Sequence, residues 1–136
     1  MYAILSAACA GFTGVVAKLG LSGISAELGL AVRTAMVFGF VLLFAIAVVP
    51  LSALSGLGPK NYLWLGISAA STALSWIFYY KALKDGEAST IALIDKGSVV
   101  VAVLLAWVIL KEEIRLQTIA GAGLILCGLW VIAKKS

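Results

Sequence analysis

The sequence of 136 residues contains no histidine and few charged side chains, which make up 12% of the chain. Without histidine the chain lacks the most common metal ligand and general base, so zinc sites and serine–histidine catalysis are not expected. The two cysteines, Cys9 and Cys127, lie in separate apolar segments without CxxC spacing, and they predict neither a disulfide framework nor a metal site. We therefore expect no cofactor, no bound metal and no enzymatic activity.

Apolar residues are in large excess. Hydrophobic residues make up 63% of the chain and its mean hydropathy is +1.15. In soluble domains only about 45–50% of the residues are apolar. A chain of this size cannot bury so much apolar surface against itself, so most of it should face lipid. The ten Lys and Arg residues are scattered singly, which argues against a nucleic-acid partner. The sequence predicts an all-α integral membrane protein.

Five apolar segments approach the ~20 residues that a helix needs to cross the hydrocarbon core. Charged residues, Gly or Pro separate them, and together they fill residues 1–136 as a single domain. The predicted helices are residues 2–17, 28–50, 62–80, 88–110 and 116–133. Their connections are short, so neighbouring helices should run antiparallel and pack as one compact bundle of five transmembrane helices.

An odd number of spans places the two termini on opposite membrane faces. The N-terminal face holds Lys60, Lys111 and Arg115, whereas the C-terminal face holds Lys18, Lys81, Lys84, Lys134 and Lys135. The excess of cations predicts a cytoplasmic C-terminus in a multi-pass protein of the inner or plasma membrane. The margin is modest, so a minority population in the opposite orientation, a dual topology, is compatible with it.

Three charged residues lie inside the predicted spans: Arg33 in the segment 28–50, and Asp95 and Lys96 in the segment 88–110. At ~1.5 Å per residue all three lie ~10–12 Å inside the same membrane face. Charges at that depth are costly unless paired, which makes them candidates for a functional site. Because adjacent helical residues project ~100° apart, we expect Asp95 to pair with Arg33 instead of Lys96. A structural ion pair and a substrate or proton role for Asp95 both stay open.

Polar and aromatic side chains extend this candidate site. We expect a substrate or ion pathway lined by Asp95, Arg33, Lys96, Trp76, Tyr79, Ser75 and Thr13. In the alternative interpretation, Arg33 reaches the lipid headgroups, the aromatic residues form an interfacial belt, and the small polar residues serve helix packing.

Several short motifs follow one another in a characteristic order, namely Leu30–Arg33, Tyr79–Leu83, Gly86–Ser89, Lys111–Glu113 and Ala120–Gly128. In this order they resemble the EamA domain of the drug/metabolite transporter superfamily. The resemblance implies export of small metabolites, such as amino-acid-like, nucleotide-like or drug-like solutes. Typical members carry two such domains as an inverted repeat of ten helices, whereas this chain has one. The resemblance therefore implies pairing with a second, oppositely oriented copy or with a partner chain.

The main hypothesis is a secondary transporter, embedded in the lipid bilayer and acting on a small-molecule substrate as an antiparallel homodimer. The segment 116–133 is the candidate interface and the segment 88–110 the second choice. If transport is coupled to protons, Asp95 is the available carboxylate. The alternative is a non-transporting membrane subunit or half-transporter that needs a different partner chain.

Overall fold

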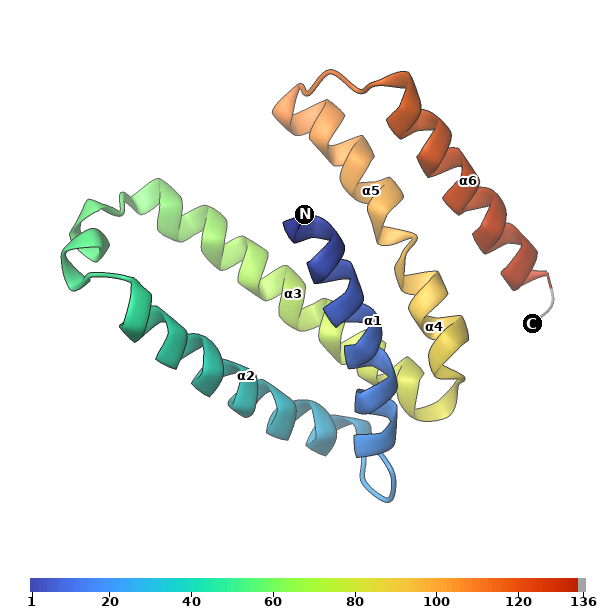
Figure 1. The fold of residues 1–136 in the computed structure, drawn as a ribbon, viewed down its shortest axis with the longest axis horizontal. Helices are drawn as coiled ribbons and strands as arrows, with labels where there is room; N and C mark the ends of the chain where they lie inside the picture. The colour runs from blue at the N-terminus through green and yellow to red at the C-terminus, as the bar shows by residue number, and fades with distance from the viewer. Residues whose placement is uncertain (135–136) are drawn as a thin grey trace. The chain divides into compact units, whose positions relative to one another are not determined.

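The computed structural model describes residues 1–134; Lys135, predicted to be cytoplasmic, lies outside the described residues. Within residues 1–134 the chain contains no strand and forms five helical segments, the fourth of them interrupted (Figure 1). They are α1 (Tyr2–Gly20), α2 (Ala26–Val48), α3 (Pro59–Asp85), the series α4 (Ala88–Asp95), α5 (Ser98–Leu105) and η2 (Ala106–Leu110), and α6 (Leu116–Ala133), with a short 3₁₀ helix η1 (Leu51–Gly56) between α2 and α3. The predicted all-α fold class is confirmed.

Four of the five segments are long and apolar enough to cross a membrane: α1, α2, residues 88–110 and α6. Serine and threonine lower the hydropathy of the remaining segment, α3. Residues 61–80 of α3 nevertheless carry no charged side chain, and at ~1.5 Å per residue this length matches the hydrocarbon thickness. The chain is a multi-pass membrane protein.

The helix boundaries differ from the predicted ones mainly at α3, which begins three residues earlier and ends five residues later than predicted. Pro59 starts α3, a position where its missing N–H group costs no hydrogen bond. Lys81 and Lys84 continue the helix instead of ending it, because cations interact favourably with the carbonyl end of the helix dipole. At the start of α2 the Ser25 hydroxyl caps the helix, because it accepts a hydrogen bond from the Leu28 N–H at 3.2 Å.

The segment 88–110, predicted as one helix, is a single apolar span in the structure with a tighter turn at Lys96 and Gly97. Lys96 and Gly97 separate α4 from α5, and their N–H groups donate to carbonyls three residues earlier, at 3.1 and 2.9 Å. These shorter hydrogen-bonded rings tighten the chain locally. Gly97 also permits a close approach to α6, because a Cβ atom there would lie 3.0 Å from Leu129 Cδ1. The segment ends in one π-helical turn closed by Lys111 in the left-handed conformation, with φ 54°.

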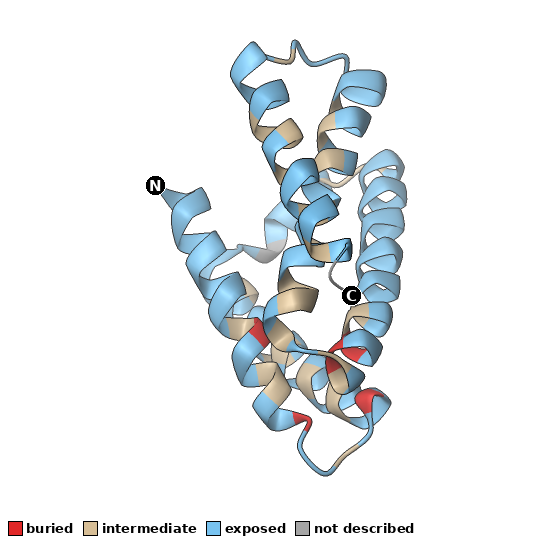
Figure 2. Ribbon diagram, turned by 90° about the vertical axis from the view of Figure 1, so that its right-hand side faces the viewer, coloured by how far each residue is buried: buried red, intermediate tan, exposed pale blue. Residues whose placement is uncertain are grey.

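The chain divides into two compact units, residues 17–85 and a second unit made of residues 1–16 and the chain from Gly86 onward. The buried hydrophobic residues Leu21, Ala26, Tyr80 and Leu83 all belong to the unit 17–85 (Figure 2). Gly29 contributes to this small core, because a Cβ atom there would overlap the Leu21 side chain. Most other large apolar side chains are exposed, as expected for helices whose solvent is lipid.

Candidate functional site

Arg33 of α2 lies over two aromatic residues of α3 within the unit 17–85. Its guanidinium carbon is 4.6 Å from the ring centroid of Trp76 and 5.8 Å from that of Tyr80. Tyr79 completes the aromatic group, with its ring centroid 6.3 Å from that of Tyr80 and the planes inclined at 58°. Cation–π contacts of this kind stabilise a partly desolvated guanidinium. The structure thus brings together two of the predicted site residues, Arg33 and Trp76, and Tyr79 contacts the neighbouring Tyr80.

One nitrogen of Arg33 lacks a hydrogen-bond partner. Within the described residues, Nη1 is buried and makes no hydrogen bond. The predicted ion pair with Asp95 stays a prediction, because Arg33 and Asp95 belong to different units, each of which is described by itself.

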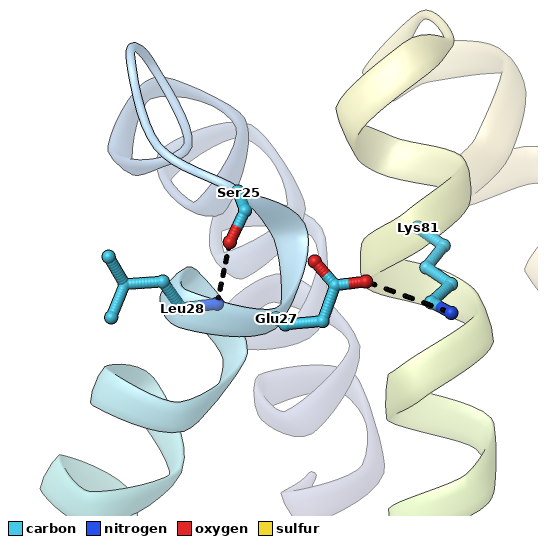
Figure 3. A network of polar contacts seen from close by, with 4 residues as sticks. All are labelled: Ser25, Glu27, Leu28 and Lys81. Carbon is cyan, nitrogen blue, oxygen red and sulfur yellow. Dashed lines mark hydrogen bonds and ion pairs between the residues drawn. The ribbon is translucent and has the colours of Figure 1, made fainter.

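An ion pair joins the start of α2 to α3 closer to the membrane face. Lys81 Nζ lies 3.7 Å from Glu27 Oε1, and the Ser25 cap precedes Glu27 by two residues (Figure 3). Both charged side chains are more than half exposed, so this pair contributes little to stability. The Glu27 carboxylate nevertheless provides the Lys81 ammonium group with a partner of opposite charge.

Two further lysines bond to the ends of each other's helices. Lys18, in the last turn of α1, donates to the carbonyls of Leu83 at 2.6 Å and Lys84 at 2.9 Å, near the end of α3. Lys84 in turn donates to the carbonyl of Leu21, just after α1, at 3.0 Å. The last carbonyls of a helix have no partner within it, so each lysine satisfies the other helix's end. The sequence analysis placed both lysines at this face but did not identify their hydrogen-bond partners. The position of each lysine in the last turn of its helix could have indicated that it bonds to helix-end carbonyls.

Asp95 and Lys96 form the second part of the predicted site, at the break between α4 and α5. Lys96 Nζ lies 3.7 Å from Asp95 Oδ2, with the side chains 54% and 40% exposed, respectively. The expectation that these neighbours would not pair is therefore wrong. Lys96 follows the last residue of α4, and its long side chain is flexible enough to turn back to the preceding carboxylate.

The two remaining predicted site residues are hydroxyl-bearing. The Thr13 hydroxyl donates to the Cys9 carbonyl one turn earlier in α1, at 2.8 Å, which satisfies the donor within its own helix. Ser75 is exposed on α3, directly before Trp76. A role for either residue in a pathway stays a prediction.

An apolar cavity of about 680 Å³ lies between α2 and α3 in the unit 17–85. Trp76 belongs both to its lining and to the aromatic group around Arg33. Side chains of both helices line the cavity, among them Leu30, Thr34, Phe38, Leu65, Ser68 and Thr72.

Charged residues within apolar spans and an apolar helix broken at a charged pair are typical of membrane transport proteins. The profile of the EamA-like transporter family matches residues 1–134. The chain therefore belongs to the EamA-like transporter family, and it is a membrane transporter of the drug/metabolite transporter type. Membership of this family supports a non-enzymatic role.

Two relatives carry similar descriptions. A protein of a Sinorhizobium species, described as an uncharacterized transporter in the region 3′ of cobO, is 30% identical over 132 residues, which are 97% of this chain and 94% of that protein. An uncharacterized transporter of Archaeoglobus fulgidus is 32% identical over 75 residues, which are 55% of this chain and 26% of that protein. No solved structure matches the chain.

Proposed function

We propose that the protein is a secondary transporter that moves small metabolites across the inner or plasma membrane. The observation that carries this proposal is the interruption of the apolar segment 88–110 at Lys96 and Gly97, with the Asp95–Lys96 pair beside it. At Lys96 and Gly97 the N–H groups bond to carbonyls three residues earlier instead of four. A short stretch of this tighter hydrogen bonding within a helix often marks a functional hinge.

We further propose that two oppositely oriented copies form the working transporter. The Archaeoglobus relative is roughly twice as long as this chain, as the 75 matched residues are 26% of it. Two units with an odd number of spans, joined by a short connection, necessarily have opposite orientations. Separate copies reproduce that arrangement when they insert in opposite directions.

The helix α6 is the proposed interface between the copies. Cys127 is exposed, and a Cβ atom at Gly121 or Gly128 would meet nothing within 4 Å. Small residues on an open helix face allow close approach of a second helix within a bilayer. Toward α5, Gly123 and Leu126 line a cavity of about 530 Å³.

Coupling to protons is assigned to Asp95. The Asp95 carboxylate lies within an apolar segment, next to the ammonium group of Lys96. A proton on the carboxylate would remove the negative charge that attracts this ammonium group. A carboxylate that exchanges an ion-pair partner for a proton is a common element of proton-driven transporters.

The proposal is tested with purified protein reconstituted into vesicles across which a pH gradient is imposed. We expect saturable, gradient-dependent movement of a solute from a metabolite panel, chosen beforehand by its ability to raise the thermal stability of the protein. Asp95→Asn should abolish the gradient dependence. Asp85→Asn, at the exposed end of α3, is the matched control and should leave it unchanged. A folded protein that binds no solute and moves none would instead indicate an accessory subunit.

A further inference from the structure

The guanidinium of Arg33 lies over two aromatic rings, and one of its nitrogens is buried without a hydrogen-bond partner. Trp76 and Tyr80 lie over it at 4.6 and 5.8 Å. Hydrogen bonds of a guanidinium lie in its plane, so the aromatic contacts leave the donors of its edge unused. Within the described residues Nη1 is buried without an acceptor. An acceptor group is therefore missing at this position.

The Arg33 side chain does not extend to the membrane face. Trp76 lies nine residues before the end of α3 and Tyr80 lies five residues before it, which is ~13 and ~8 Å at the rise of an α-helix. The guanidinium is closer to Trp76 than to Tyr80. The aromatic side chains therefore hold the guanidinium at least one helical turn before the end of α3.

The other cations at this end of the unit 17–85 already have acceptors. Lys18 and Lys84 donate to helix-end carbonyls, and Lys81 pairs with Glu27. Four cations, including Arg33, stand against two acids, Glu27 and Asp85. The local excess of positive charge favours binding of an anion.

The surroundings of Arg33 also indicate what kind of anion fits. The buried Nη1 can donate to one oxygen of a carboxylate, whose negative charge complements that of the guanidinium. Trp76 also lines the apolar cavity of about 680 Å³, together with Leu30, Phe38 and Ile77. A ligand with its anionic group at Arg33 therefore has apolar surface available beside it for the rest of the molecule.

We propose that Arg33 binds the carboxylate of the transported solute and that the substrate class is small monocarboxylates with an apolar portion lying in the adjacent cavity. This inference rests on the proposed transport function. Trp76 and Tyr80 act as positioning residues, since they orient the guanidinium.

The first test uses the unmodified protein in an uncharged detergent and two matched pairs of probes. The pairs are 3-phenylpropionate with 3-phenylpropanamide, and 4-methylpentanoate with 4-methylpentanamide. Each pair keeps the apolar part and changes only the charge. We expect the carboxylates to raise the thermal stability with an apparent affinity about tenfold or more above that of the amides. Equal effects within both pairs, or no effect of any probe, would overturn the inference.

The second test compares variants. Arg33→Gln keeps hydrogen-bond donors but removes the charge, and it should abolish the preference for carboxylate over amide. Arg33→Lys should keep a weaker preference, because a lysine has the charge without the planar edge. Lys81→Gln is the matched control, since Lys81 is exposed in its ion pair, and it should keep the full preference. If the Arg33→Gln variant does not fold, the Arg33→Lys variant and the probe pairs on the unmodified protein still test the inference.

Lipid headgroups offer an oxyanion too, so the probes are repeated in phosphatidylcholine vesicles with and without phosphatidylglycerol. Arg33-dependent stabilisation by phosphatidylglycerol without any effect of the carboxylates would assign the site to lipid and overturn the inference. Transport of amines or neutral solutes that is unaffected by Arg33→Gln would overturn it while the transport function stands. Arg33-dependent carboxylate binding without solute movement would support it while refuting transport by this chain alone.

Discussion

Lys18 offers the sharpest test of how the ends of α1 and α3 are held together. Its ammonium group donates to two carbonyls of α3, one of them on Leu83, which is 0% exposed. Replacement by methionine keeps the apolar length of the side chain but removes both hydrogen bonds. The Leu83 carbonyl then lies too deep to bond to water.

The expected loss follows from these contacts. A hydrogen bond to a charged group contributes ~1.5–3 kcal/mol, and a buried acceptor left without a donor costs ~1–3 kcal/mol. Hydrogen bonds measured in membrane proteins are weaker, at ~0.6 kcal/mol on average. For two such bonds in a partly buried site we expect Lys18→Met to lower the free energy of unfolding by about 1.5–3 kcal/mol. Lys84→Met, which removes one bond, should cost about half as much.

The measurement is reversible unfolding in mixed micelles by titration with dodecyl sulfate, followed by circular dichroism. Lys81→Met is the matched control, because Lys81 lies on the same face but makes only an exposed ion pair, for which we expect less than about 1 kcal/mol. The argument fails if Lys18→Met destabilises the protein no more than Lys81→Met does.

Three further predictions concern the pathway, the topology and the assembly. Asp95→Asn should stay folded but lose coupled transport, and normal coupled transport by this variant would mean that Asp95 has only a structural role. Single cysteines in residues 55–60 should be labelled from outside the cell more strongly than those in residues 84–87, and equal labelling would indicate dual topology. Crosslinks through Cys127 should join copies whose termini lie on opposite faces, and copies of a single orientation would refute the inverted pair.

The sequence by itself determined the class of this protein and most of its helices. The hydropathy of a segment depends only on its own residues, and a helix cap acts within one turn. Both features can therefore be predicted from a short stretch of sequence. The segment 116–133 expected from the sequence has the same ends as α6 in the structure, Leu116 and Ala133. The charged candidates Arg33 and Asp95 were identified because a charge within an apolar run is visible without a structure.

The tertiary structure decided which of these residues meet. Lys18 bonds to a carbonyl 65 residues away, and Arg33 is held by rings on α3; neither contact leaves a periodic trace in the sequence. The break at Gly97 escaped prediction as well, since glycine within an apolar helix is common and only the approach of Leu129 distinguishes this one. Helices in lipid are specified one by one by their hydropathy, whereas their contacts depend on the shapes and hydrogen-bonding groups that packing brings together.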